Sequence, residues 1–302
     1  MHIPDGYLAT PVWATLDVAA APAVGYLARR AQKGLEQSSV PLLGVMGAFV
    51  FAAQMINFPV AAGTSSHLVG AALLAYALGP AAAGVVLTAI LAVQALVFQD
   101  GGILALGANV INMAIAGMLA GYLPYWLLGA GRWRRQAIFL GGFLSLLTSG
   151  VLAMGELILS GVPMPGVVIR FSLGVFLVSA VLEGAITLAI MQALTAIHPE
   201  LLRQPQSDGR RALGWIGVGA IILAVAGVAM ASAYPDGIER LADATGIASH
   251  ATTLLRTPLA DYQLGTLGSA WLRKAGAGLA GISLIYGALL VGGKWLARKR
   301  GA

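Results

Sequence analysis

The chain has 302 residues, of which 58% are hydrophobic and only 10% are charged, and its mean hydropathy is +0.84. No charged side chain lies between Glu36 and Asp100, or between Asp100 and Arg132, whereas a soluble domain carries roughly 25% charged residues. The formal net charge is +6, but the basic residues are spread along the chain instead of covering one soluble face, which argues against nucleic-acid binding. The absence of cysteine excludes disulfides and thiolate metal sites.

This composition predicts an all-α integral membrane protein in contact with membrane lipid. A spanning helix needs about 20 mainly apolar residues, and Pro, Gly and charge clusters divide the chain into about nine such segments. The expected spans are residues 9–28, 40–57, 64–78, 82–98, 106–128, 137–160, 167–194, 214–233 and 276–296.

The residues before the first span form a possible chelate for a transition metal. The chain begins Met1-His2, and the Met1 amine, the His2 backbone nitrogen and the His2 ring nitrogen nearer the backbone can close two fused rings on one ion. Such donors suit nickel, copper, cobalt and zinc, and a planar set with a deprotonated amide favours nickel(II) or copper(II). The turn sequence Pro4-Asp5-Gly6 and the lack of a basic leader predict an uncleaved first helix. Retention of Met1 is expected because trimming of the first methionine generally requires a small second residue and His2 is large.

The positive-inside rule favours an amino terminus on the external side. That orientation places 13 of the 18 basic residues inside: Arg29, Arg30, Lys33, Arg132, Arg134, Arg135, Arg203, Arg210, Arg211, Lys294, Arg298, Lys299 and Arg300. It also brings the connections 58–67 and 100–102 to the face that carries Met1 and His2.

His67 is expected just inside the third span, on this same face. A lone histidine in a membrane is either a ligand or a hydrogen-bond partner, and the residues alone leave both open. His198 and His250 are expected to be solvated loop residues. Gln94, Asn109 and Asn112 either bond neighbouring helices or orient the metal ligands, and the spacing of the two asparagines predicts that they share a helix face.

Four ionisable residues fall within or near the spans. Glu156 and Arg170 flank a short external turn, and we predict that they form an ion pair. Asp17 and Glu183 are either structural or take part in coupling.

The polar stretch 198–212 reads as a cytoplasmic linker. It separates a seven-helix capture domain, residues 1–197, from a two-helix accessory module, residues 213–302. The module contains an external segment with the sequence Pro235-Asp236-Gly237-Ile238-Glu239.

Several of these sequences resemble the CbiM/NikM family, the substrate-capture components of energy-coupling factor transporters for cobalt and nickel. The resemblance covers about the first two-thirds of the chain. It is carried by Met1-His2-Ile3-Pro4-Asp5-Gly6-Tyr7-Leu8, Gly63-Thr64-Ser65-Ser66-His67-Leu68, Gln94-Ala95-Leu96-Val97-Phe98, Asp100-Gly101-Gly102 and Gly107-Ala108-Asn109-Val110-Ile111-Asn112-Met113. The Pro235–Glu239 stretch resembles the PDGLE type of accessory component, with Ile238 in place of leucine.

The resemblance implies a metal held by Met1, His2 and His67, with the ion as transported substrate. The supporting residues are expected to be Ser65, Ser66, Gln94, Asp100, Asn109 and Asn112. It also implies a transmembrane coupling component and cytoplasmic ATP-binding-cassette ATPases as partners, in a prokaryotic plasma membrane. Planar nitrogen coordination and the PDGLE-like stretch favour Ni(II), with Co(II) for cobalamin supply as the alternative.

Two other classes of function stay open from the residues. An intramembrane metalloenzyme is one, although the chain has no His-Glu-x-x-His motif. A purely structural membrane scaffold, which would bind no metal, is the other.

Overall fold

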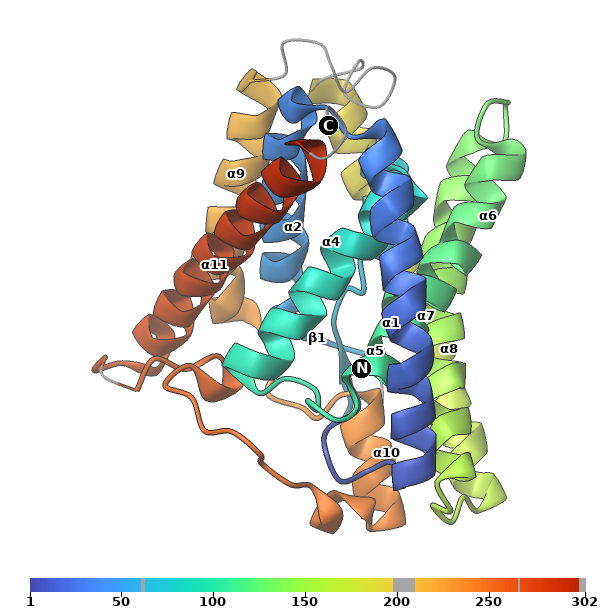
Figure 1. Cartoon of the computed structure of the whole chain (residues 1–302). Helices are drawn as coiled ribbons and strands as arrows, with labels where there is room; N and C mark the ends of the chain where they lie inside the picture. Colours follow the sequence, from blue (N-terminus) through green and yellow to red (C-terminus); the bar gives the residue numbers. More distant parts are fainter. Residues whose placement is uncertain (61–62, 198–209, 266, 299–302) are drawn as a thin grey trace.

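Figure 1 shows the computed structural model, which describes residues 1–60, 63–197, 210–265 and 267–298. The chain is helical almost throughout. The helices are α1 (Thr10–Gly34), α2 (Val40–Gln54), α3 (Ala71–Leu78), α4 (Pro80–Val93), α5 (Leu106–Asn109), α6 (Met118–Leu128), α7 (Arg134–Leu159), α8 (Gly166–Ile197), α9 (Arg210–Val225), α10 (Gly237–Thr245) and α11 (Ala270–Arg298). Two π-helical stretches, η2 (Gln94–Phe98) and η3 (Val110–Gly117), continue α4 and α5. Short 3-10 turns are η1 (Gln37–Ser39), η4 (Gly227–Met230), η5 (Ile247–His250) and η6 (Ala260–Tyr262).

The all-α membrane class is confirmed, but the number of spans is not. Within the described residues, six helical segments are long and apolar enough to cross a membrane: Gln37–Gln54, Pro80–Phe98, Leu106–Leu128, Arg134–Leu159, Gly166–Ala196 and Ala270–Arg298. Helix α1 has 25 residues but carries Asp17 and the basic Arg29, Arg30 and Lys33. Helix α9 belongs to a shorter apolar segment, Leu213–Ala229.

The expected third span, residues 64–78, is wrong in its first half. Ser65 and Ser66 form strand β2 (Ser65–Ser66), which pairs antiparallel with β1 (Phe58–Pro59). Gly70 then adopts a left-handed φ of 71°, and α3 begins only at Ala71. Residues 64–70 are all buried, and irregular backbone at membrane depth is tolerated only where protein surrounds it. His67 therefore lies on an extended segment that precedes the helix.

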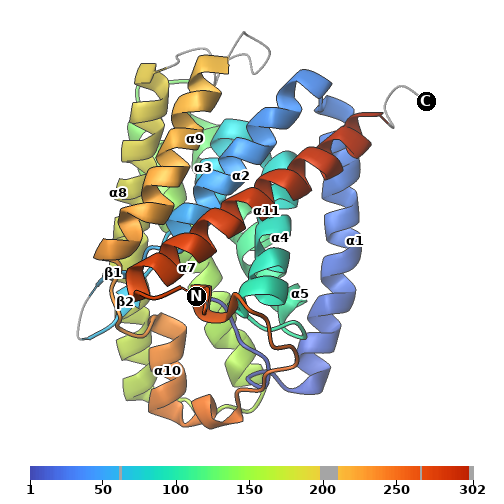
Figure 2. The ribbon, with the colours of Figure 1, turned by 90° about the vertical axis from the view of Figure 1, so that its left-hand side faces the viewer.

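The basic ends of several helices gather at one end of the bundle. Figure 1 places the end of α1, the connection between α6 and α7 and the end of α11 there, with α10 at the opposite end, and Figure 2 shows the same for α1, α10 and α11. Each of these three places carries basic residues: Arg29 lies in the last part of α1, Arg132 in the connection between α6 and α7, and Arg298 at the end of α11. This arrangement agrees with the charge distribution that predicts an external amino terminus.

Helices α9 and α11 pack against α2, so the two parts of the chain share a helix interface. Glycines allow the close approach, as is usual in membrane helix packing. A Cβ atom added at Gly47 would lie 2.2 Å from a Leu289 methyl carbon, and one at Gly281 would lie 2.2 Å from the Phe51 ring. The external segment that connects α9 to α11 is thereby held against the first part.

The predicted ion pair between Glu156 and Arg170 is wrong. Glu156 is buried, and its Oε2 accepts a hydrogen bond of 2.8 Å from Asn112 Nδ2. Arg170 is exposed, and the ion pairs among the described residues do not include it. An uncharged amide from η3 satisfies the carboxyl inside the bundle, which lets the arginine face outward. Asp17 likewise has a structural role, because its Oδ1 accepts a 2.7 Å bond from Gly107 N at the start of α5.

We therefore expect Arg170→Ala to change the free energy of unfolding by no more than about 0.5 kcal/mol, as is usual for exposed positions. Asn112→Ala should lower the melting temperature, because it removes the donor to the buried Glu156 carboxyl. Thermal melting of both variants in the same detergent measures the difference. A large loss from Arg170→Ala alone would restore the ion pair.

Candidate metal centre

The amino-terminal residues are threaded into the protein instead of projecting from it. Met1 is 4% exposed and Ile3 is fully buried. The Asn109 side chain bonds both backbone groups of Ile3: its Oδ1 accepts from Ile3 N at 2.8 Å, and its Nδ2 donates to Ile3 O at 3.0 Å. Gly102 N also donates to Ile3 O, at 2.8 Å. The position of the first two residues is thus fixed by backbone bonds at the third.

Asp5 fixes the same segment from the other side. Its carboxylate accepts backbone bonds from Ile103 N at 2.9 Å and Leu104 N at 2.8 Å. Gly6 has a φ of 92°, and a Cβ atom there would lie 1.9 Å from the carbonyl oxygen of His250. Only glycine fits this turn, because it combines a left-handed conformation with a close backbone neighbour.

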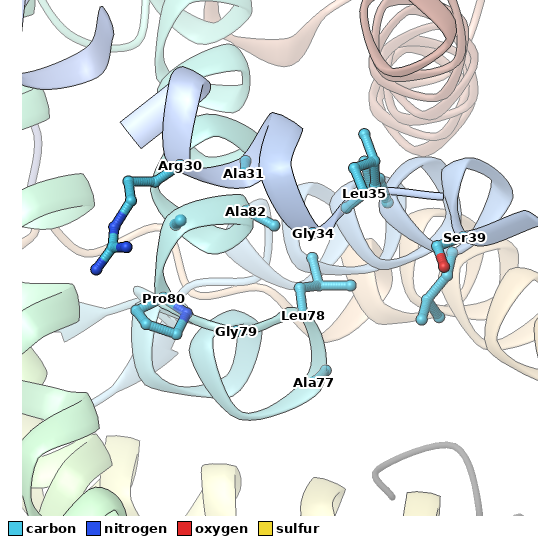
Figure 3. A pocket seen from close by; sticks show the side chains of 13 residues that line it. Arg30, Ala31, Gly34, Leu35, Ser39, Ala77, Leu78, Gly79, Pro80 and Ala82 are labelled. Carbon is cyan, nitrogen blue, oxygen red and sulfur yellow. The ribbon is translucent and has the colours of Figure 1, made fainter. Parts of the chain in front are cut away.

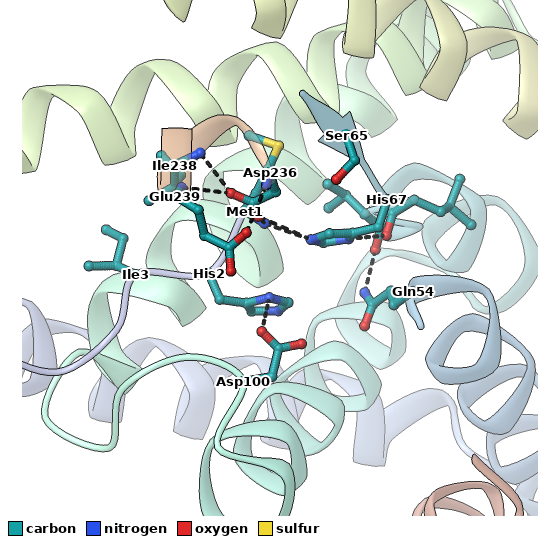
Figure 4. Close-up of polar contacts among 12 residues, drawn as sticks. Met1, His2, Ile3, Gln54, Ser65, His67, Asp100, Asp236, Ile238 and Glu239 are labelled. Carbon is teal, nitrogen blue, oxygen red and sulfur yellow. Dashed lines mark hydrogen bonds and ion pairs between the residues drawn. The ribbon is translucent and has the colours of Figure 1, made fainter. Parts of the chain in front are cut away.

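The Met1 amine lies between His67 and Asp236 (Figure 4). Its nitrogen is 2.6 Å from His67 Nε2 and forms an ion pair with Asp236 Oδ2. Two nitrogen donors bound at right angles about 2.0 Å from one metal ion are separated by about 2.8 Å. The amine and the imidazole are therefore spaced nearly as neighbouring donors around a metal would be.

The His2 ring stacks on the His67 ring, with centroids 5.2 Å apart and an angle of 9° between the planes. His2 Nδ1, the ring nitrogen nearer the backbone, lies 3.0 Å from Asp100 Oδ1, and Tyr262 donates to Asp100 Oδ2 at 2.5 Å. His2 Nε2 is buried and has no hydrogen-bond partner among the described residues. The ring must turn away from Asp100 before Nδ1 can join the Met1 amine in a chelate.

The extended segment presents His67 through a set of buried contacts. His67 Nδ1 lies 3.0 Å from the carbonyl oxygen of Leu68, which can only accept, so the proton resides on Nδ1 and the Nε2 lone pair faces the Met1 amine. Val69 and Gly70 follow His67 in the chain, and their backbone N–H groups donate hydrogen bonds of 2.9 Å to the Glu183 carboxyl. Gln54 Nε2 donates to Val69 O at 2.8 Å. Glu183 therefore has a structural role behind the histidine.

The electrostatic setting keeps His67 neutral. Burial, followed by the positive charges of the amino terminus and His2, lowers the pKa of the His67 imidazole from 6.5 to about 3. Burial raises the pKa of the Asp236 carboxyl, but the amino-terminal charge outweighs it and the pKa lies below its ordinary value. Burial also raises the pKa of the Asp100 carboxyl, but the charge of His2 outweighs it and the pKa lies below its ordinary value. A neutral imidazole between two carboxylates suits a divalent cation.

Three of the expected supporting residues lie at the site. Asp100 contacts His2, and Asn109 holds the neighbouring backbone of Ile3. Gln94 Nε2 donates to Gln54 Oε1 at 2.9 Å and to Tyr262 OH at 3.1 Å, which connects it to Asp100.

The other three supporting residues have different surroundings. Ser65 contacts the second part of the chain, with its N bonded to Pro235 O and its Oγ to Tyr234 O. Ser66 Oγ is buried and finds no partner in the part of the chain that the structure describes. Asn112 binds Glu156 and not the amino-terminal segment. The two asparagines thus serve different partners, since the chain becomes π-helical between them.

Two residues at the site were missed from the sequence. Asp236 and Tyr262 belong to the external segment, yet they contact Met1 and Asp100. Asp236 caps α10, accepting from Ile238 N at 2.7 Å and Glu239 N at 2.9 Å. The Pro235–Glu239 pattern indicates an accessory component, but a single sequence carries no signal that pairs Asp236 with a residue 235 positions away.

Two cavities help to delimit the site. One of about 270 Å³ is lined by His2 and His67 together with residues of the external segment. A larger one, of about 360 Å³, lies at the other end of the bundle, between α1, α2 and the turn from α3 to α4 (Figure 3). The described residues that line it are mostly apolar, with Arg30 and Ser39 as polar members and no carboxylate or histidine. Of these two cavities, the first is the one lined by histidines and carboxylates.

Within the described residues, no three side chains of His, Asp or Glu form a ready metal cage. The Met1 amine and the His2 amide, which the sequence predicts as donors, belong to the backbone and are therefore not among such side chains.

Comparisons with known proteins find relatives among metal transport proteins. The family CbiM, described as "Cobalt uptake substrate-specific transmembrane region", matches residues 2–201. A putative fused nickel transport protein NikMN of Archaeoglobus fulgidus is 34% identical over 244 residues, covering 78% of this chain and 77% of that protein. The fused nickel transport protein NikMN of Rhodobacter capsulatus is 28% identical, covering 94% and 95%. The cobalt transport protein CbiM of Acetoanaerobium sticklandii is 32% identical, covering 66% and 86%.

Solved structures add a three-dimensional likeness. A crystal structure of a transition metal transporter superposes with a TM-score of 0.60 at 33% identity, covering 70% of this chain and 99% of the other. A crystal structure of a truncated transition metal transporter superposes with a TM-score of 0.59 at 35% identity, covering 66% of this chain and 100% of the other.

Proposed function

Because the chain belongs to the CbiM family of cobalt uptake substrate-specific transmembrane regions, we propose that it captures Ni(II) for an ATP-driven energy-coupling factor transporter. Its family and relatives show that it is a metal-transport component and not an enzyme. The chain is a multi-pass membrane protein of the prokaryotic plasma membrane. The proposal adds the ion, the site and the energy source. The site consists of the Met1 amine, the amide and ring nitrogens of His2, and His67 Nε2.

One observation carries the proposed site. The Met1 nitrogen lies 2.6 Å from His67 Nε2, with the His2 ring stacked beside it, although 66 positions separate Met1 from His67. Amine and imidazole nitrogens prefer late first-row metals over magnesium or calcium. Burial of all three residues removes competing water from the donors.

The preference for nickel rests on the donor set and on the fused nickel transport relatives. A planar site with an ionised amide nitrogen suits nickel(II) better than cobalt(II). In equilibrium competition on the purified full chain, we expect Ni(II) to displace Co(II) at equal concentration, by about tenfold in affinity. Metal content after dialysis against both ions measures this. A preference for cobalt would make the chain a cobalt-capture subunit with the same site.

We assign capture to residues 1–197 and an accessory role to residues 213–302, joined by the linker 198–212. His198 and most of that linker lie outside the described residues. The proposed partners are a transmembrane coupling component and cytoplasmic ATP-binding-cassette ATPases, since no nucleotide-binding motif is recognisable in this chain. Uptake of nickel by cells that produce the chain with and without such partners tests the ATP-driven step.

A further inference from the structure

The cavity of about 270 Å³ beside the metal centre lies between the capture helices and the external segment. We propose that this loading cavity holds the hydrated divalent cation before the ion exchanges its water for the nitrogens of Met1, His2 and His67. The inference rests on the proposed function and adds a second, outer position for the same ion.

The lining changes from buried donors to exposed carboxylates. His2 and His67 are 6% and 5% exposed, whereas Asp261 in η6 is exposed to solvent. Glu239 in α10 is exposed as well, whereas Asp236 is buried, and Figure 4 shows both beside Met1 and His2. An ion that enters from solvent therefore meets exposed carboxylates before it meets the buried nitrogen donors.

Two of the four carboxylates in the described lining are already engaged, and two are available. Asp236 is occupied by the Met1 amine and by the backbone of α10, and Asp100 by His2 and Tyr262. Glu239 uses one oxygen, Oε2, to accept from Asp236 N at 2.8 Å. Asp261, in the part of the chain that the structure describes, makes no side-chain hydrogen bond or ion pair, and its backbone φ is 53°.

A buried nitrogen at the inner end points to a ligand independently of the acidic groups. His2 lines the cavity, and its Nε2 has no hydrogen-bond partner within the described ranges although the side chain is only 4% exposed. A buried polar atom left unpaired costs about 1–3 kcal/mol. The hydration shell of a cation in the cavity offers this nitrogen a hydrogen-bond partner.

Size and charge both fit a hydrated ion. Six waters at about 30 Å³ each occupy about 180 Å³, which is less than the 270 Å³ of the cavity. Lys274 is the one basic side chain among the described lining residues, against the carboxylates of Asp100, Asp236, Glu239 and Asp261. A cleft with an excess of one charge concentrates oppositely charged ligands and speeds their association by about 10-fold or more.

The decisive measurement is the rate at which the purified full chain takes up nickel. Radioactive Ni(II) is mixed rapidly with the protein at low ionic strength, and uptake is stopped with excess chelator. The double variant Glu239→Gln with Asp261→Asn should load about tenfold more slowly, with the same bound nickel per chain at saturation. Lys274→Gln should load faster, and all differences should shrink in high salt.

The substitutions preserve the local structure. Glutamine can replace glutamate in the capping box of α10, and asparagine tolerates a left-handed backbone as aspartate does. Asp243→Asn is the control for each of the two changes, because it removes one carboxylate charge from an exposed position on α10 outside the cavity lining. It should leave the loading rate within about twofold of wild type.

The outcomes separate this inference from the proposed function. Wild-type loading by the double variant, or an equal slowing by Asp243→Asn, would overturn the loading cavity. A wild-type chain that binds no nickel at saturation would overturn the proposed function itself.

Discussion

Inserting one proline between Met1 and His2 should abolish tight nickel binding, with a loss of affinity of at least about 100-fold. The insertion places three more backbone atoms between the amine and the His2 amide, so the two fused chelate rings can no longer form, and the proline nitrogen has no proton to lose and cannot replace the missing donor. It also displaces the amine from His67 Nε2, 2.6 Å away, because Ile3 and Asp5 are anchored by backbone bonds. Changes that only affect residues supporting a metal ligand already cost about 10–100-fold. Isothermal titration calorimetry with Ni(II) measures the effect.

The matched control is a proline inserted between Gly131 and Arg132, in the exposed connection between α6 and α7. Both insertion variants should elute as wild type in gel filtration and keep a helical circular-dichroism spectrum. Only the first should lose nickel. A masking group on the amine should have the same effect as the first insertion. If tight binding survives either change, the amino-terminal chelate is refuted.

The sequence was sufficient where composition and covalent connectivity decide the structure. The apolar runs predict most of the long helices because lipid tolerates few charges and requires internally bonded backbone. Met1 and His2 are neighbours in the chain, so their shared chelate needs no folding information. The fold class and the first donors follow from such local features.

The extended segment before α3 could not be predicted in the same way. Residues 64–78 contain no charge, so hydropathy alone favours a helix. In the structure, Glu183 on α8 binds the backbone of Val69 and Gly70, and Gln54 on α2 binds Val69 again. These long-range bonds satisfy backbone groups that a helix would otherwise satisfy, and no local pattern indicates them.

Pairings between distant polar side chains were equally hidden. Glu156 was expected to bind the nearby Arg170, but Asn112 binds it from another helix. Asp236 contacts Met1 across almost the whole chain. A charge pattern predicts that a buried acid needs a partner, whereas the choice of partner depends on how the helices pack.

His67→Ala should weaken nickel binding by at least about 100-fold, whereas His250→Ala should leave it unchanged. The His67 ring supplies the proposed fourth nitrogen and stacks on His2, so its loss removes a donor and the surface that orients the other ring. His250 is also on the amino-terminal side of the fold, but its side chain is exposed and it approaches Gly6 through its backbone carbonyl, which alanine retains. The two substitutions thus compare a buried imidazole with an exposed one, and nickel titration of both variants measures the difference.

The shape of the site should survive the loss of the His67 ring. Glu183 and Gln54 hold the extended segment through its backbone at Val69 and Gly70, and neither contact involves the imidazole. A loss of nickel binding with an unchanged melting temperature would therefore identify a missing donor and not a misfolded segment. The reverse pattern, with His250→Ala losing nickel and His67→Ala retaining it, would move the metal to the external segment. Asp236 would then be a direct ligand instead of the partner of the Met1 amine.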